Sequence, residues 1–503
     1  MGIETLEKIN KQFGLDYWSN RINSWEDFPS VVGTINGSLG SEFSKFQRTL
    51  VTDFLTWQVS IVNEYKRDDQ FVTQNFDFEW RGHSFGIQPD VDHFEAAQAF
   101  DIAGVDIYHP SQDDLTGIEI SFGGDVARSI KGNNYLVLET EAQAFSHWTP
   151  YPGQLRLQAF SHLASGANMV AYWHWHSIHN SFETYWKGLL SHDFEPNPTY
   201  NEAKTIGRDF NRLSSDLVNL KKNNKASILV SNEALTAIDW FKFNFTSTKN
   251  YNDIVRSIYD ELYKMNIECD FVNPSSDHFE NYKLLIVPAL YTASDELLER
   301  LNKFVSNGGH IVYTFKSGFT TEHVQVRTSH QPGIINEVCG IYYNQFVEPK
   351  NVSLKNDPFE VGEQNNYVET WMELITPTTA EVLAYYDHPH WGEYAAITQN
   401  SYGMGVATYI GAIPSPAIMG AVLKQSVEKA GLWGKDQELA FPLITKQGMN
   451  EAGETIRYYF NYSEEVNSFN YPYKDGVELI SETEINKDET IEMGPWEVII
   501  LKA

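Results

Sequence analysis

Four short apolar runs decide the fold of the first 210 residues: FVTQN (71–75), GVDIY (104–108), YLVLE (135–139) and NMVAYWHW (168–175). Their first residues lie 33, 31 and 33 residues apart. Helix-compatible stretches separate them, notably around 94–100 and 154–163. The βα units of a parallel sheet require this alternation of strand and helix. We therefore expect four βα units.

The number of these units limits the architecture of the region. A closed TIM (β/α)₈ barrel needs eight βα units and roughly 250 residues. Residues 1–215 hold four units, so we expect them to form the C-terminal half of such a barrel. The first half would then be missing, or supplied by another, upstream chain.

The remainder of the chain changes pattern twice. Residues 225–425 predict a flavodoxin-like α/β domain, in which the helix from Asp295 ends at Gly308-Gly309 and strand HIVYTF (310–315) follows. Its first strand leads into SNEALTA (231–237), which is not a glycine-rich phosphate loop. Neither cysteine stands in a nucleophile elbow, which argues against amidotransferase chemistry. Residues 435–503 carry short alternating segments and predict a small antiparallel β domain.

The composition excludes several classes of function. The 37 basic and 67 acidic residues give a net charge of −30, which repels nucleic acid and anionic membrane surfaces. The two cysteines, Cys269 and Cys339, indicate a reducing compartment. Because neither a signal peptide nor an apolar run of 18 residues occurs, we expect a cytoplasmic protein. Aromatic residues reach 14%, a content that suits flat hydroxylated ligands such as sugars.

Polar residues end the four predicted strands, at the edge where a βα barrel places its active site. They are Asn75, Tyr108, Glu139 and the pair Trp175-His176. Glu139 follows a run of apolar residues and is our candidate nucleophile or acid, with a solvated loop position as the alternative. Glu141 would share the face of Glu139 and competes for the same role.

Aromatic side chains gather in the sequence around this carboxylate, and such rings stack against the C–H faces of sugars. They are Phe145, Trp148, Tyr151, Trp173, Trp175 and Trp186. Trp173 suits a core position equally well, because strand alternation turns it away from Trp175. Trp148 lies in the loop SHWTPYPGQ (146–154), where core packing explains it less easily.

Several longer stretches together resemble the family 42 glycoside hydrolases, which are bacterial β-galactosidases. These stretches are LDYWSNRINSWEDFP (15–29), FVTQNF (71–76), VDIYHP (105–110), YLVLETEAQAFSHWTPYPGQ (135–154), GANMVAYWHWHS (166–177) and NSFETYWKG (180–188). The resemblance runs through all three predicted domains. It implies a catalytic barrel, a flavodoxin-like trimerisation domain and a small β domain, hence a homotrimer acting on terminal β-D-galactosides.

The resemblance also implies roles for single residues. Glu139 occupies the position of the family's catalytic nucleophile. Asn75 and Tyr108 match positions that line the sugar subsite, Trp148 matches the tryptophan over the galactose, and Glu183 matches a glutamate that holds sugar hydroxyls.

The chain departs from the family at three places. His176 stands where the family usually has Arg, and Trp186, which we keep as a substrate-binding candidate, stands where it has His. The family's acid/base glutamate, in an Asn-Glu pair, and its zinc-binding cysteines fall before the start of this chain.

Two features imitate functional sites. Asn63-Glu64 resembles the Asn-Glu pair, but FVTQN begins seven residues after Glu64, too soon for a strand end, a helix and a new strand. We therefore place Glu64 on the surface of a helix. His174, His176 and His179 have no carboxylate or thiolate at a familiar ligand spacing, so we expect no metal and no cofactor.

The sequence thus predicts a β-galactosidase-like retaining glycoside hydrolase, incomplete by itself because its acid/base residue lies upstream. The alternative is a catalytically inactive C-terminal fragment that binds sugar or only oligomerises.

Overall fold

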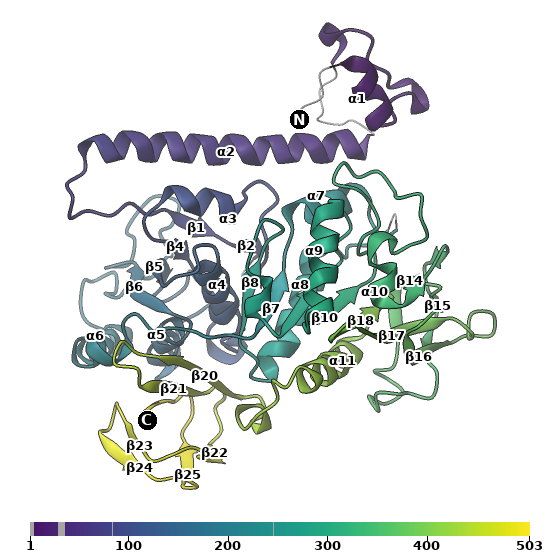
Figure 1. Cartoon of the computed structure of the whole chain (residues 1–503). Helices are drawn as coiled ribbons and strands as arrows, with labels where there is room; N and C mark the ends of the chain where they lie inside the picture. The colour runs from purple at the N-terminus through teal and green to yellow at the C-terminus, as the bar shows by residue number, and fades with distance from the viewer. Residues whose placement is uncertain (1–4, 29–35, 83, 245) are drawn as a thin grey trace.

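The computed structural model describes residues 5–28, 36–82, 84–244 and 246–503 (Figure 1). Pro29, the last residue of the first family-like stretch, lies outside this part. Within it, no helix is both long and apolar enough to cross a membrane.

A parallel sheet of four strands organises the region before residue 215, in the order β1-β4-β5-β6. Its strands are β1 (Asn75–Asp77), β4 (Gly104–Asp106), β5 (Tyr135–Glu141) and β6 (Ala167–Trp173). Its helices are α3 (His93–Ala96), α4 (Ile118–Ser129), α5 (Gln154–Ala164) and α6 (Pro198–Leu217). The strands follow one another along the sheet as four consecutive βα units require. The assignment of this sheet to half of a barrel stays a prediction.

The first strand is shorter than the sequence predicts, because it begins only at Asn75. The preceding residues bond to the loop before β4 instead: Val72 N–H donates to the Asp101 carboxylate (2.8 Å) and Thr73 Oγ1 to the Ile102 carbonyl (2.8 Å). These side-chain bonds replace a regular ladder over residues 71–74.

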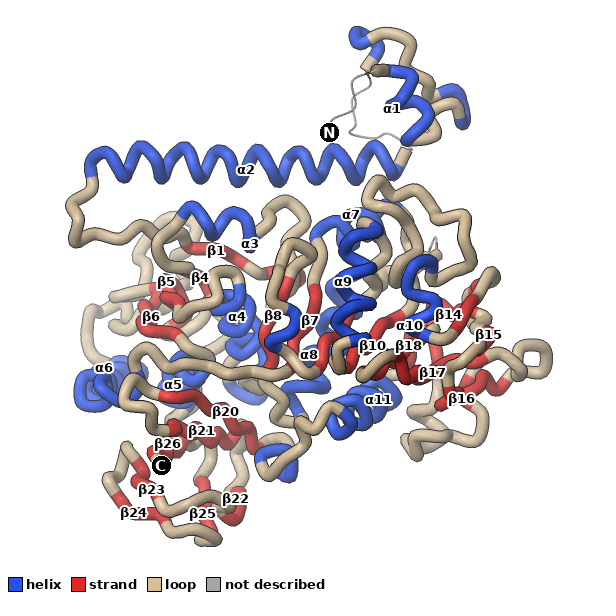
Figure 2. Tube along the Cα trace, in the orientation of Figure 1, coloured by secondary structure: helices blue, strands red, loops and turns tan. Residues whose placement is uncertain are grey.

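An eight-stranded sheet forms the second region (Figure 2), in the order β13-β16-β17-β18-β10-β9-β7-β8. Its parallel part contains β7 (Ala226–Leu229), β8 (Cys269–Val272), β9 (Leu284–Val287), β10 (His310–Thr314) and β18 (Gly405–Ile410). The order of these five strands is that of flavodoxin-like sheets. Three antiparallel strands extend it: β13 (Ser353–Leu354), β16 (Glu381–Asp387) and β17 (Ala395–Tyr402).

Four longer helices accompany this sheet: α7 (Asn232–Trp240), α8 (Tyr251–Lys264), α9 (Asp295–Ser306) and α11 (Pro416–Lys429). Local sequence sets their ends. Asn250 and Asp253 form a capping box at the start of α8. Helix α9 stops before Gly308, whose φ of +107° favours glycine, as the sequence predicts.

The C-terminal segment folds into antiparallel sheets below the first region (Figure 1). The larger sheet contains β20 (Leu443–Met449), β21 (Thr455–Asn461), β23 (Gly476–Glu478), β24 (Thr483–Ile485) and β26 (Val498–Lys502). The smaller one pairs β22 (Asn467–Asn470) with β25 (Thr490–Met493).

A buried ionic network connects the three regions. Arg128 of α4 donates to Asp125 (2.8 Å), to the carbonyl of Ser165 (2.6 Å) and to Asp270 of β8 (2.7 Å). Lys446 of β20 donates to Ser165 Oγ (2.9 Å) and lies 3.7 Å from Asp125. Because an unpaired buried charge is costly, these partners hold α4, β8 and β20 together.

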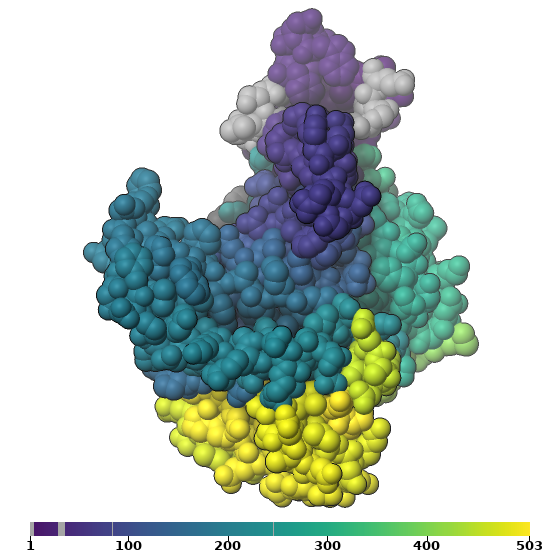
Figure 3. Space-filling view, turned by 90° about the vertical axis from the view of Figure 1, so that its left-hand side faces the viewer, coloured from purple at the N-terminus to yellow at the C-terminus, as the bar shows by residue number. Residues whose placement is uncertain are grey.

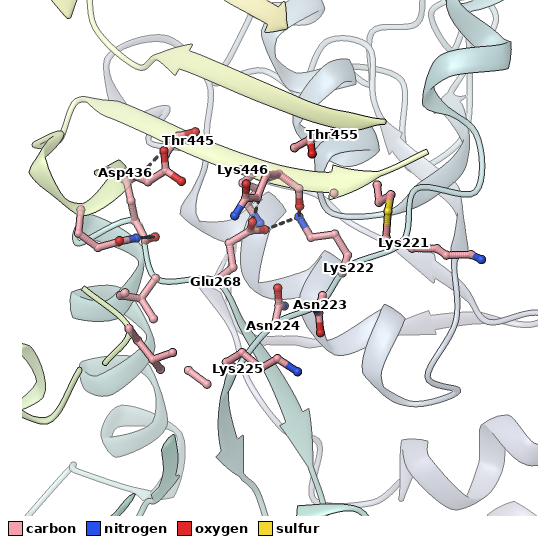
Figure 4. A pocket seen from close by; sticks show the side chains of 18 residues that line it. Lys221, Lys222, Asn223, Asn224, Lys225, Glu268, Asp436, Thr445, Lys446 and Thr455 are labelled. Atoms are coloured by element: carbon pink, nitrogen blue, oxygen red, sulfur yellow. Dashed lines mark hydrogen bonds and ion pairs between the residues drawn. The ribbon is translucent and has the colours of Figure 1, made fainter. Parts of the chain in front are cut away.

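A polar cavity of about 590 Å³ adjoins this network (Figure 4). Lys222 and Glu268 form an ion pair in its wall. Burial lowers the pKa of Lys222 to about 8, although the Glu268 charge acts in the opposite direction.

Candidate active site

Glu139 and Tyr108 meet at the C-terminal end of the four-stranded sheet. Asp106 of β4 is in register with Glu139 of β5, and Tyr108 follows two residues later on the same face. The Tyr108 hydroxyl donates a hydrogen bond of 2.9 Å to Glu139 Oε2. Burial, and then the charge of Glu139, raise the pKa of Tyr108, so this hydroxyl stays a donor. The Glu139 side chain is half-buried and keeps access to solvent.

Asp106 supplies a second carboxyl group beside Glu139. Its Oδ2 accepts from Asn75 Nδ2 at 2.9 Å, whereas its buried Oδ1 has no hydrogen-bond partner. Burial is the main cause that raises the pKa of Asp106 to about 6, and the charges of Glu139 and Asp77 add to it. Asn75, which the sequence places at the end of the first strand, is instead the first residue of β1, and only its side chain reaches the Asp106 carboxylate.

Glu141 has a different environment from Glu139, although only Thr140 separates them. It is 3% exposed and accepts from the His109 N–H at 3.1 Å, with His109 Nδ1 at 3.3 Å. Burial raises the pKa of Glu141. Its carboxylate therefore fixes the loop that follows Tyr108, rather than facing open space.

An aromatic cluster adjoins Tyr108, the hydrogen-bond partner of Glu139. Trp186 packs edge-on against Tyr108, with ring centroids 5.4 Å apart, and lies 5.7 Å from Phe145. Its Nε1–H donates to the Trp173 carbonyl at 3.2 Å, which fixes the ring. Trp175 is not part of this cluster: it is 59% exposed and packs against Tyr200.

Lys187 connects the Trp148 loop to the loop after β6. Its ammonium group donates to the Trp148 carbonyl (2.5 Å) and to Thr149 Oγ1 (2.7 Å). Trp148 is half-buried and packs edge-on against His147, with ring centroids 4.4 Å apart. This lysine therefore places Trp148 next to the segment that carries Trp186.

Glu183 and the histidines lie along the same outer loop. Glu183 is exposed, and its charge acts on His174, whose pKa is lowered chiefly by burial. His176 and His179 both pack against Phe194 (5.1 and 4.7 Å). Over the described ranges, no group of three His, Cys, Asp or Glu side chains is arranged to hold a metal ion.

Glu64 lies near the end of the long helix α2 (Gly37–Tyr65) and is exposed, as the sequence predicts.

The structure thus brings together Glu139, Tyr108 and Trp186, holds Asn75 through Asp106, and leaves Glu183 on the outer loop. Asp106 was not predicted from the sequence, although its spacing of two from Tyr108 indicates a shared face. Lys187 was not predicted either, because no local pattern in the sequence marks it. The site offers a fixed, solvent-accessible carboxylate and a second carboxyl of raised pKa, which are the groups that acid/base and nucleophilic chemistry require.

Two family models match consecutive parts of the chain. The β-galactosidase model matches residues 2–213, and the β-galactosidase trimerisation domain model matches residues 224–433. The chain belongs to glycoside hydrolase family 42.

Two curated β-galactosidases that the chain resembles are longer than the chain. The β-galactosidase bgaB of Geobacillus kaustophilus is 27% identical over 85% of this chain, which spans 62% of that protein. The β-galactosidase LacA of Lactobacillus acidophilus is 27% identical over 99% of this chain, which spans 74% of it.

The fold also matches solved structures. A β-galactosidase from Bacillus circulans sp. alkalophilus superimposes with a TM-score of 0.86 at 21% identity. This match covers 99% of the present chain and 74% of the solved one. The α/β fold with a parallel sheet and further β domains is therefore that of family 42 structures.

Proposed function

We propose that the chain is the part of a retaining β-galactosidase that carries the nucleophile, Glu139, and that its substrates are terminal β-D-galactosides. The observation that carries the proposal is the bond from Tyr108 to Glu139 at the C-terminal end of β5, in a chain of this family. A half-buried carboxylate that is held by only one hydroxyl can act as the attacking nucleophile.

The reaction follows the two-carboxyl scheme of retaining glycosidases. Glu139 attacks the anomeric carbon, and the glycosidic C–O bond breaks while a carboxylic acid protonates the leaving oxygen. The resulting carboxylate then removes a proton from water, which attacks the anomeric carbon and releases Glu139. Tyr108 orients the Glu139 oxygen that it binds.

The proposed substrate contacts come from three loops and one strand end. Trp148 and Trp186 offer ring faces for the sugar, because aromatic side chains combine a large apolar surface with a defined orientation. Asn75 and Glu183 offer polar groups for its hydroxyls, and Tyr108 contributes to the same subsite.

The acid/base carboxyl of this reaction remains to be assigned. It must lie about 5 to 5.5 Å from the carboxyl of the nucleophile, Glu139. We propose that it comes from further βα units that pair with the open edge of β1, whether they belong to the same polypeptide or to another. A groove of about 320 Å³ runs along this edge, lined among others by Val51, Leu55 and Phe76. Asp106 is the alternative, because it is next to Glu139 and has a raised pKa.

We further propose that residues 225–425 assemble the protein as a homotrimer, with residues 1–215 and 435–503 as separate domains. Support comes from the match to the trimerisation model. The cytoplasmic location stays a prediction from the sequence.

The decisive experiment measures hydrolysis of an aryl β-galactoside by the 503-residue chain, alone and mixed with a fragment that carries the first four βα units of a family member. We expect negligible turnover alone and restored turnover in the mixture. If the chain alone turns over at an ordinary rate of about 10 per second, the acid lies within it, and Asp106→Asn and Glu64→Gln identify it. Galactose binding without hydrolysis, both by the chain alone and in the mixture, would favour the non-catalytic alternative.

A further inference from the structure

The loop between β6 and α6 carries two of the proposed substrate residues, Glu183 and Trp186. Its two arms are joined by backbone hydrogen bonds, among them the bond from the Leu190 N–H to the Trp175 carbonyl (2.9 Å). Beyond these arms the chain turns through residues 178–186, which we call the tip. Figure 3 shows the blue-teal part of the chain, which includes this loop, as a lobe that stands away from the purple helix α2.

The His192 imidazole closes the tip. Its Nε2 lies 2.9 Å from the Ile178 carbonyl oxygen and 3.1 Å from the Thr184 carbonyl oxygen. Because carbonyl oxygens only accept hydrogen bonds, Nε2 carries the proton and donates to both. Ile178 begins the tip, and Thr184 stands directly after Glu183 and two residues before Trp186. One donor therefore ties the start of the tip to the backbone that orients both of these residues.

A second histidine holds His192 in this position. His179 Nε2 donates to the His192 carbonyl (2.6 Å), and the centroids of the two rings lie 5.5 Å apart. The His179 ring also stacks on Phe194, with centroids 4.7 Å apart. His192 is itself exposed, so burial of its ring does not explain its place beside the tip. Hydrogen bonds therefore run in both directions, from His179 to the His192 backbone and from the His192 ring to the tip.

Two backbone hydrogen bonds inside the tip depend on this closure. The Ile178 N–H donates to the Trp186 carbonyl (3.1 Å), and the Trp186 N–H donates to the Glu183 carbonyl (2.8 Å). These bonds set the direction in which the side chains of Glu183 and Trp186 leave the backbone. The Trp186 ring then lies 5.4 Å from the ring of Tyr108. The geometry of the tip thus decides where the two side chains meet a sugar.

We propose that His192 is a positioning residue of the galactoside subsite: its Nε2–H fixes the tip and so sets how tightly Glu183 and Trp186 hold the sugar. This role rests on the proposed function of these two residues. Glu139 belongs to β5 and Tyr108 follows β4, and the hydrogen bond between them lies outside the tip. His192 therefore acts on the binding of the substrate and not on the chemical step.

Two substitutions separate the hydrogen bonds of His192 from the packing of its ring. His192→Gln keeps an N–H donor as many bonds from the backbone as Nε2, whereas His192→Phe keeps a ring without a donor. Amide hydrogen exchange on the 503-residue chain measures the tip at the N–H groups of Ile178 and Trp186. We expect roughly 3- to 10-fold faster exchange at both in His192→Phe, and rates near those of the wild type in His192→Gln.

The Leu190 amide, outside the tip, is the internal control and should keep its rate in both variants. Unchanged exchange at Ile178 and Trp186 in His192→Phe, or equal acceleration in the two variants, would overturn the proposal.

Steady-state kinetics with an aryl β-galactoside test the consequence for binding, on the mixture that restores hydrolysis. In His192→Phe, KM should rise roughly 3- to 10-fold while kcat changes less than about twofold, and His192→Gln should keep KM near that of the wild type. An unchanged KM in a chain with a loosened tip would refute the role of His192 in binding.

The proposed function and the role of His192 can fail separately. If no preparation hydrolyses the galactoside, the proposed function fails. The galactose affinity of the chain, measured by calorimetry, should then still fall in His192→Phe relative to the wild type and to His192→Gln. Equal affinities in the three chains would overturn the proposal.

Discussion

Glu139 and Glu373 are both glutamates that accept a tyrosine hydroxyl, yet their environments differ. Glu139 is half-buried and takes one bond of 2.9 Å from Tyr108. Glu373 ends β14 (Val368–Glu373) and is fully buried. It accepts from the Lys316 N–H (2.7 Å), Trp371 Nε1 (3.2 Å) and the Tyr409 hydroxyl (2.9 Å).

The difference shows that the neighbours of a glutamate decide whether it can react with a substrate or only stabilises the fold. Burial raises the pKa of Glu373 to about 7, although its three donors act in the opposite direction. Donors surround this carboxyl, so no substrate can reach it. Glu139 has fewer neighbours and an open side, which a nucleophile requires.

The largest expected effect is that of Glu139→Gln. This change removes the proposed nucleophile and should lower aryl β-galactoside hydrolysis by roughly 10³-fold or more, with little change in thermal stability. Steady-state rates are measured on whichever preparation hydrolyses the substrate. Glu141→Gln is the matched control and should lose far less; the opposite ranking would assign the nucleophile to Glu141.

Glu373→Gln should change stability and not hydrolysis. The folded-state pKa of about 7 lies above the ordinary value of 4.5, so the stabilisation by Glu373 is complete below pH 4.5 and is lost as the pH rises through 7. Over this window, the free energy of unfolding of the wild type should fall by about 3 kcal/mol relative to Glu373→Gln. Denaturant titrations at pH 4.5 and 8 measure it. If the free energy of unfolding depended on pH in the same way for the wild type and for Glu373→Gln, burial would not raise the pKa of Glu373.

Tyr108→Phe should have an intermediate effect. It removes one hydrogen bond to a charged group, worth about 1.5 to 3 kcal/mol, and so should slow hydrolysis roughly 10- to 100-fold. The melting temperature should hardly change, since the ring still packs on Trp186. Unaltered kcat and KM would separate Tyr108 from the reaction.

Glu64→Gln should have the smallest effect, less than about twofold on hydrolysis, because exposed surface substitutions rarely matter. Steady-state rates again provide the measurement. A large loss would reinstate Asn63-Glu64 as the acid/base pair and refute the open-edge proposal.

The sequence predicts those parts of the fold that depend on local signals. The strand starts near 104, 135 and 168 are right within one residue, and Gly308 marks the end of α9. The late start of β1 could not be predicted, because it depends on bonds to Asp101 and Ile102, almost thirty residues away.

The candidate site divides in the same way. The rule that active sites lie at strand ends selects Glu139 and Tyr108 as neighbours, and the structure places them 2.9 Å apart. This rule cannot decide which of Glu139 and Glu141 is the accessible carboxylate. The answer depends on the His109 N–H, which only folding brings to Glu141. The roles of Asn75, Trp148, Glu183 and Trp186 stay predictions.

The network around Arg128 limits how chimeric enzymes of this family can be designed. A graft that replaces the chain from β20 onward exchanges Lys446 but keeps its partners Asp125 and Ser165. A donor sequence with an apolar residue at this position would leave Asp125 with one cation fewer in a buried place. Such grafts therefore need α4 and β20 from the same parent, even though more than 300 residues separate these elements in the sequence.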